Sequence, residues 1–238
     1  MNGRTTVAHQ VLQFNEELAE AALELPSGFK VVNPFNGPQK GHVRKVTTAF
    51  YQKYYNDHNP RRLVLGSSPA RRGTAVTGVP FEDADLLESE TGIEIDGYAV
   101  SRSSSGFIHD VIRRYGGRDR FYADFVMSFV CPLGLVKTKP KGNDVNCNYY
   151  ENKELQKSLQ SFIVDTMKRQ LAFGADTSVC YCIGSGENYR FLSRINKEQR
   201  FFEKIVPLEH PRFITQYNPE RKGDFIEKYI RALRGQGD

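Results

Sequence analysis

Two short stretches carry residue types that could do chemistry beside a buried strand. The first, LVLGSSPARRGTAVTGVPFED over residues 63–83, places two serines and two arginines in a loop rich in glycine and proline. The second, PLEHPRF, holds His210 between an apolar run and Pro211, which stiffens the backbone next to the histidine. A neutral imidazole in such a place can donate a hydrogen bond to an oxygen that gains negative charge. A purely structural role for His210 stays open, because a lone histidine is more often structural than catalytic.

Helices and strands alternate along the chain, and this order predicts how the two loops are positioned. Apolar periodicity predicts helices over 5–25, 38–56, 104–115, 151–173, 186–196 and 220–234, and strands over 62–65, 121–131, 178–183 and 204–208. Strands separated by helix-length segments form parallel sheets with helices on both faces. We therefore expect an α/β fold with three αβα layers and a mostly parallel sheet.

Basic side chains follow the predicted strands. They are Arg71 and Arg72 after the first strand, Lys137, Lys139 and Lys141 after the second, and Arg212 after the last. The carboxyl ends of parallel strands meet at one edge of the sheet, where ligands bind. That edge would present a basic rim to a phosphate backbone, in line with the net charge of +5. The alternative is that these side chains are only solvated.

The composition argues against several other classes of protein. No apolar run approaches the about 20 residues of a membrane span, and the start MNGRTTVAHQ lacks the apolar core of a signal peptide. The four cysteines match no zinc spacing and favour ordinary thiols in a reducing compartment. The run GSGENY matches a phosphate-binding glycine loop only weakly. We expect a cytoplasmic monomer without a metal site, with one domain over 1–238 that has helices over 1–58 and the sheet and motif loops over 60–234.

The first loop resembles the first motif of the uracil-DNA glycosylase superfamily. GSSPARRGTAVTGVPF is most similar to the single-strand-selective monofunctional type, whose pattern is GMNPGPFGMAQTGVPFG. The residues that match without a gap are Gly66, Pro69, Gly73, Ala75, Thr77, Gly78, Val79, Pro80 and Phe81. HPRF resembles the second motif, HPSPRN, CPLGLVK resembles a CPL segment, and Asn148 lies where an Asn-led segment is expected. The C-terminal run EHPRFITQYNPERKGDFIEKYI is also similar to a bacterial branch of the superfamily.

The resemblance implies a four-stranded parallel sheet, a DNA groove across its carboxyl edge, and no cofactor. It also implies base flipping, in which a nucleotide leaves the stack and its N-glycosidic bond is broken in a pocket. Phe81 would stack on the base, and His210 would stabilise the oxygen of the leaving base. The other expected contacts are Gly66, Ser67, Pro69, Phe129 and Asn148 for the base, and Arg71, Arg72, Lys137, Lys139, Arg212 and Phe213 for DNA.

Two positions depart from the motifs. Ser68 stands where the family has a water-positioning Asn, and a hydroxyl is shorter and lacks the paired donor and acceptor of an amide. The Asn that reads uracil just before the CPL segment is missing, since Phe129 and Val130 precede Cys131. One relative lacks a polar residue at the first position and relies on an Asp shortly after the motif's Phe, a part that Asp83 could take. Alternatively, residues 82–85 only cap the next segment.

These observations leave three functions open. The first is a monofunctional DNA glycosylase that acts on uracil or a related deaminated or damaged base. The second is a DNA-binding homologue of the same fold whose glycosylase activity is weak or lost, as Ser68 would suggest. The third is an α/β protein that handles nucleotides or another small molecule.

Overall fold

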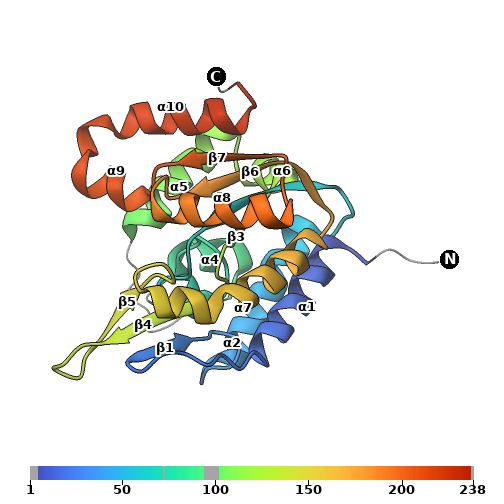
Figure 1. Cartoon of the computed structure of the whole chain (residues 1–238). Coiled ribbons are helices and arrows are strands. Elements are labelled where there is room, and N and C mark those ends of the chain that lie inside the picture. The colour runs from blue at the N-terminus through green and yellow to red at the C-terminus, as the bar shows by residue number, and fades with distance from the viewer. Residues whose placement is uncertain (1–4, 72, 94–101, 237–238) are drawn as a thin grey trace.

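The computed structural model describes residues 5–71, 73–93 and 102–236, and within them four strands form a parallel sheet in the order β3-β2-β6-β7 (Figure 1). The strands are β2 (Arg61–Gly66), β3 (Phe125–Phe129), β6 (Ala175–Ile183) and β7 (Lys204–Leu208). β2 and β3 are buried along almost their whole length. Their apolar side chains run continuously because helices cover both faces of the sheet.

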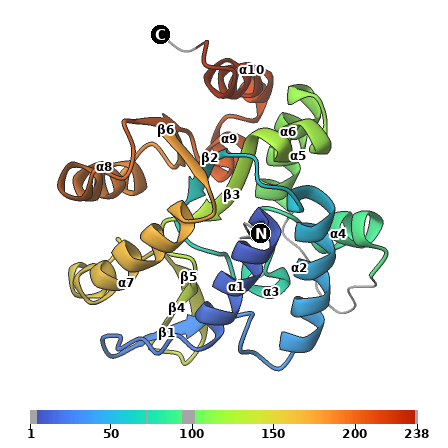
Figure 2. The same cartoon turned by 90° about the vertical axis from the view of Figure 1, so that its right-hand side faces the viewer.

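Helices form the two outer layers. They are α1 (Val7–Ala19), α2 (Lys40–Tyr55), α3 (Thr74–Thr77), α4 (Ala84–Thr91), α5 (Arg102–Tyr115), α6 (Arg118–Asp124), α7 (Lys153–Leu171), α8 (Glu187–Gln199), α9 (Pro211–Tyr217) and α10 (Lys222–Leu233), with a 3-10 turn η1 (Pro219–Arg221). α5 and α6 lie in the connection from β2 to β3. From β3 the chain crosses back past β2 to β6 and then β7, so right-handed connections place α7 and α8 on the face of the sheet opposite to α5 and α6 (Figure 2). The predicted three-layer α/β fold is confirmed.

A smaller antiparallel sheet, in the order β1-β4-β5, was not predicted from the sequence. Its strands are β1 (Phe29–Val32), β4 (Gly134–Thr138) and β5 (Asp144–Cys147). Most of the basic run over 137–146 belongs to this sheet, because β4 pairs with β1 from far earlier in the chain and turns back into β5. Gly142, with φ of 82°, allows this turn.

Two further expectations were wrong. The strand predicted over 121–131 begins only at Phe125, because α6 occupies the preceding residues. Phe121 and Tyr122 are buried on that helix, and aromatic residues favour strands when only local preference is considered. The loop expected around His210 is the start of α9, with His210 as N-cap and Pro211 at the first helical position.

The buried core includes a group of aromatic rings between α2 and α6. Phe50, Tyr54, Tyr55 and Tyr122 contact one another with ring centroids 4.9–6.3 Å apart. Arg61, the first residue of β2, donates to the backbone oxygens of Tyr54 and Tyr122. This packing closes the amino end of β2 and leaves its carboxyl end for a site. Among the described residues, no helix combines the length and apolarity needed to cross a membrane.

Candidate active site

A pocket of about 460 Å³ opens beyond the carboxyl ends of β2 and β3. Its walls come from the loop after β2, from Phe129 at the end of β3, from residues 146–148, and from α9. The volume lies within the range of about 300–1,000 Å³ that is usual for ligand pockets. The two loops that carry the sequence motifs therefore meet at one cavity, at the sheet edge where α/β proteins bind ligands.

Two aromatic rings and a glycine form one wall of the pocket. The rings of Phe81 and Phe129 are stacked, with centroids 5.3 Å apart and planes inclined by 20°. A Cβ at Gly66 would be 2.7 Å from Cζ of Phe81 and 2.9 Å from Cδ1 of Phe129, closer than carbon atoms pack. Glycine thus lets both rings reach the end of the strand, and the resulting flat apolar wall suits a planar ligand.

The backbone of Phe81 is held in an uncommon conformation. Its φ of 60° lies in the left-handed region, which a bulky residue rarely adopts. Its N–H donates to Oγ1 of Thr74 over 3.1 Å. Gly78 ends α3 with φ of 73°, and a Cβ there would be 2.8 Å from Cγ1 of Val43 on α2. The run TGVPF is therefore pressed against α2, and the strained Phe81 is of the kind found at ligand sites.

A hydrogen-bonded group of Ser67, Ser68 and Asn148 forms a polar wall. The two serine hydroxyls donate to Oδ1 of Asn148 over 2.8 and 3.2 Å. Nδ2 and the backbone N–H of Asn148 donate to Oε1 of Glu151 over 3.0 and 2.8 Å, and these bonds orient the amide. Because the serine hydrogens are engaged, their lone pairs offer acceptors to a molecule in the pocket.

His210 enters the pocket from the N-cap of α9. Its Nδ1 accepts the backbone N–H of Arg212 over 3.1 Å, so the proton of the neutral ring sits on Nε2. Burial, helped by the nearby Arg212 charge, lowers the pKa of His210 to about 4. The ring is thus neutral near pH 7, and its Nε2–H has no hydrogen-bond partner among the residues that the structure describes, which suits the donor role predicted for this position.

Glu82 lies behind the aromatic wall in a buried polar network. Its side chain borders the pocket, and one carboxylate oxygen lies 3.1 Å from both His109 Nε2 and Arg118 Nη2. Tyr122 donates its hydroxyl to the other oxygen. Burial alone would raise the pKa of Glu82, but hydrogen bonds from His109 and Tyr122 and the Arg118 charge hold it below its usual value. Glu82 is therefore a carboxylate at neutral pH.

Asp83, a candidate for the catalytic carboxylate, lies deeper than the prediction requires. It is 3 % exposed, directly precedes α4, and accepts a hydrogen bond from Ser105 Oγ over 3.2 Å. Within the described part of the chain, Ser105 lines the pocket whereas Asp83 does not. The structure therefore places Ser105 between this carboxylate and the cavity.

The predicted lysines do not reach the pocket. Lys137 and Lys139 lie on the hairpin formed by β4 and β5, and Lys141 lies in its turn. The expectation that they lie at the carboxyl edge beside the strand over 121–131 was wrong, because β4 follows β3 and carries them into the antiparallel sheet. A sequence pattern shows that a strand exists but not which sheet it joins.

Among the remaining predicted DNA contacts that the structure describes, Arg212 is the one that lines the pocket. It donates to Oε1 of Gln216 over 2.8 Å. Arg71 is joined to the mouth through its backbone N–H, which donates to Oδ1 of Asn146 over 3.0 Å. Phe213 is 47 % exposed on α9. Arg72 lies outside the described residues.

Several pocket residues were not singled out from the sequence. They are Ser104, Ser105, Asn146, Cys147 and Gln216, together with Glu151, which orients Asn148. Gln216 is one helical turn beyond Arg212, a relation that is visible only once residues 211–217 are known to be helical. The sequence NCN over 146–148 could have indicated some of these pocket residues, because two polar residues flank a buried cysteine there.

Neither the cysteines nor the GSGENY run adds chemistry to the pocket. Burial raises the pKa of Cys147, the cysteine that lines the pocket, to about 11, so its thiol is protonated at neutral pH. GSGENY begins α8, where Asn188 is buried and bonded to Tyr149 and Ile183. Among the residues that the structure describes, no group of three or more His, Cys, Asp or Glu side chains could hold a metal ion.

Comparison with known proteins places these features in a family. The sequence model of the uracil DNA glycosylase superfamily matches residues 52–234, which include the pocket residues described above. The crystal structure of wild-type Pedobacter heparinus SMUG2 is similar with a TM-score of 0.91 and 40% sequence identity, over 98% of this chain and 98% of that chain. No curated protein sequence matches this chain.

Proposed function

Because the chain belongs to the uracil-DNA glycosylase superfamily, we propose that it flips a deaminated or damaged base, uracil or a related lesion, out of DNA and excises it. The reaction is hydrolysis of the N-glycosidic bond. The bond between C1′ and the base nitrogen breaks, water oxygen bonds to C1′, and the proton released by the water ends on the base. The product is an abasic site, and the chemistry uses no cofactor.

The aromatic wall would receive the flipped base. Phe81 offers its ring face to a planar base, and Gly66 lets the ring lie close to the strand end. Stacking on an aromatic side chain contributes about 1–3 kcal/mol per base in single-strand complexes. The strained backbone of Phe81 supports this role, because the ring is already in place before a base arrives.

The neutral His210 beside this wall is the observation that carries the proposal. As the C1′–N bond breaks, negative charge grows on an oxygen of the leaving base. The Nε2–H of His210 can donate to that oxygen, and its orientation is set in advance by the bond from Arg212 N–H to Nδ1. A preorganised donor that meets charge developing in the transition state is a main source of catalysis.

Ser68 and Asn148 together would position the attacking water. Asn148 Oδ1 accepts the hydroxyl hydrogens of both serines, which leaves the lone pairs of the serine oxygens as acceptors. A water that donates its hydrogens to the serine oxygens keeps a lone pair for C1′. The amide that the family places at position 68 is then replaced by serine hydroxyls that the Asn148 amide orients from the same wall of the pocket. This arrangement offsets the shorter reach of the Ser68 hydroxyl.

The polar wall also favours certain bases. The Asn with which the family reads uracil just before its CPL segment is missing here, so base-edge recognition falls to the lone pairs of the Ser67 hydroxyl, whose hydrogen is held by Asn148. An acceptor on one wall and the His210 donor on another suit a ring N–H next to a carbonyl. Uracil and deaminated purines have this pattern, as do thymine and guanine, whereas cytosine and adenine lack the ring N–H on that edge.

A lesion panel under single-turnover conditions tests this function. Labelled oligonucleotides that each contain one uracil, hypoxanthine or xanthine are incubated with excess protein and then cleaved at abasic sites with alkali. We expect cleavage of at least one lesion, and a rate lowered about 10²–10³-fold by His210→Ala. His9→Ala, an exposed histidine on α1, is the matched control and should leave the rate unchanged. Absence of cleavage for every lesion at high protein concentration would overturn the proposal.

Ser68 supports a second function, a DNA-binding homologue with weak or lost activity. This alternative predicts salt-dependent DNA binding that weakens when Arg71 and Arg72 are both changed to Ala, without excision. It also predicts that Ser68→Asn gains excision that the wild-type chain lacks. Efficient excision by the wild-type protein would exclude it.

A further inference from the structure

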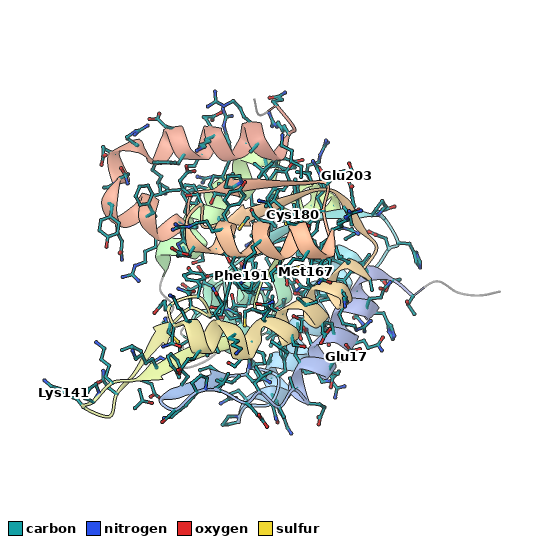
Figure 3. The ribbon with its side chains drawn as sticks, viewed as in Figure 1. Glu17, Lys141, Met167, Cys180, Phe191 and Glu203 are labelled. Carbon is teal, nitrogen blue, oxygen red and sulfur yellow. The ribbon has the colours of Figure 1, made fainter. Side chains whose placement is uncertain are left out.

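The hairpin of β4 and β5 carries lysines that have no carboxylate partner. Lys137, Lys139 and Lys141 are exposed, and none forms an ion pair within the part of the chain that the structure describes. Figure 3 shows Lys141 at the tip, far from the body of the protein. By contrast, Lys30 on β1 pairs with Asp144 over 3.3 Å. Three positive charges are therefore left in solvent on a projecting element.

The hairpin has a defined geometry. β4 is hydrogen-bonded to β1 on one side and to β5 on the other. The turn is closed by the Gly142 N–H, which donates to the Lys139 oxygen over 2.8 Å, and by Thr138 Oγ1, which donates to Asp144 Oδ1 over 2.7 Å. Lys137 Nζ lies 5.8 Å from the centre of the Phe29 ring. The lysines are thus presented at spacings set by the strand rather than by a loose loop.

The hairpin is also continuous with the pocket. β5 runs from the basic turn to residues 146–148, which form one pocket wall. Asn146 Oδ1 accepts the backbone N–H of Arg71 and so joins the hairpin to the loop after β2. The Arg71 backbone therefore adjoins the stretch of β5 that leads from the basic turn to the pocket.

We propose that the β4–β5 hairpin is a phosphate-binding arm that holds the DNA backbone on one side of the flipped nucleotide, outside the pocket. This inference rests on the proposed function, because it assumes a DNA substrate at the pocket. Strand residues rise about 3.3 Å each, so β5 carries the chain roughly 10 Å from Cys147 at the pocket to Asp144, and the turn that holds residue 141 projects beyond Asp144. With a DNA rise of about 3.4 Å per base pair, the arm reaches phosphates beyond roughly three positions from the lesion.

The test compares two triple variants that remove the same charge from opposite ends of the molecule. One is Lys137→Gln, Lys139→Gln and Lys141→Gln. The control is Lys168→Gln, Lys197→Gln and Lys204→Gln, which are exposed positions in the last turns of α7 and α8 and at the first residue of β7. Binding is measured by fluorescence anisotropy over a range of salt concentrations. The probe is a duplex of about 30 base pairs with a central tetrahydrofuran abasic analogue, so the lesion need not be known.

We expect the hairpin variant to bind this duplex at least about tenfold more weakly and to lower the salt slope by roughly 2–3, since each phosphate contact contributes about 0.9. The control variant should change neither quantity appreciably. A duplex with only about three base pairs on the side that the arm covers lacks the phosphates that the arm would contact. Such a duplex should bind the hairpin variant and the control variant with similar affinity.

Two results would contradict the arm, and they differ from failure of the proposed function. An unchanged salt slope in the hairpin variant would exclude phosphate contacts by these lysines even if the protein excises bases. If the hairpin variant lost the same affinity for the full-length duplex and for duplexes shortened on either side of the abasic analogue, the lysines would act through their general charge and not as an arm. If the wild-type protein bound no DNA, the proposed function and the arm would both be wrong.

Discussion

At His210, one helix start sets both the orientation and the charge of a side chain. The N-cap position turns Nδ1 toward the Arg212 N–H, and burial removes the positive form of the ring. The same histidine on an open loop would titrate near its ordinary pKa of about 6.5 and would rotate freely. The environment supplied by α9 therefore makes this residue suitable as a neutral donor.

The lowered pKa of His210 predicts a specific dependence on pH. The unfolded chain binds a proton at this histidine below about 6.5, whereas the folded protein does so only near 4. The free energy of unfolding should therefore fall as the pH is lowered from about 6.5 to 4, and this residue should add no slope above 6.5. Urea denaturation across this range should show a smaller fall for His210→Gln than for the wild type.

The same shift predicts the pH profile of excision. Single-turnover rates should stay level down to about pH 5 and decline only as the pH approaches the pKa of about 4. An acid limb with a midpoint near 6.5 that disappears in His210→Gln would show that the ring is protonated at its ordinary pKa, contrary to this assignment.

At the scale of an element, α9 presents two neighbouring stripes of side chains. Arg212 and Gln216, one turn apart, line the pocket and bond to each other. Phe213 and Tyr217 form the adjacent stripe, 47 % and 71 % exposed, and they are the large hydrophobic side chains left exposed in the described chain. Exposed aromatic rings beside a nucleic-acid site provide surfaces on which unpaired bases stack.

This stripe predicts that α9 contributes to DNA affinity separately from catalysis. Tyr217→Ala and Phe213→Ala should each weaken binding of lesion DNA by about 1–3 kcal/mol, the usual contribution of a base–aromatic stack. Tyr217→Phe keeps the ring and is the matched control, with binding close to that of the wild type. If loss of either ring left the binding measured by anisotropy unchanged, the stripe of Phe213 and Tyr217 would not belong to the DNA interface. The midpoint of thermal unfolding should change little, because both rings are exposed.

At the scale of the whole molecule, one buried network joins the pocket to three helices. Glu82 contacts His109 on α5 and both Arg118 and Tyr122 on α6, and Arg118 also pairs with Glu90 on α4 over 2.8 Å. The residue that precedes Glu82 is Phe81, whose ring forms the aromatic wall. The position of that ring is thus coupled to the packing of helices on one face of the sheet.

Loss of Glu82 should therefore destabilise the whole fold. Glu82→Ala leaves the half-buried Arg118 without one of its carboxylate partners and the buried Tyr122 hydroxyl without its acceptor, and removing a buried ionic partner in this way costs about 3–5 kcal/mol. Glu198→Ala, an exposed position on α8, is the control and should stay within about 0.5 kcal/mol of the wild type. The measurement is the free energy of unfolding in urea at pH 7. A loss below about 1 kcal/mol would show that water or a rearranged partner replaces the carboxylate.

The sequence by itself determined the parts of this protein that depend on local pattern. Buried runs such as residues 63–65 indicated parallel strands, and glycine, proline and aromatic positions over 66–81 identified the pocket loop and its family. Backbone geometry and apolar periodicity act over a few residues, so they are readable without the fold. His210 was found for the same reason, because its motif is contiguous.

Only the tertiary structure decided which distant residues meet. Asn148 bonds to Ser67 and Ser68 from about 80 positions away, Asp83 lies behind Ser105, and β4 joins β1 rather than the parallel sheet. The basic residues predicted to share one edge of the sheet therefore lie in two places in the described chain: Arg212 lines the pocket, and the lysines lie on the separate hairpin of β4 and β5. Such contacts follow from packing of the complete chain, and no periodicity within a short window encodes which partner a side chain or a strand edge will find.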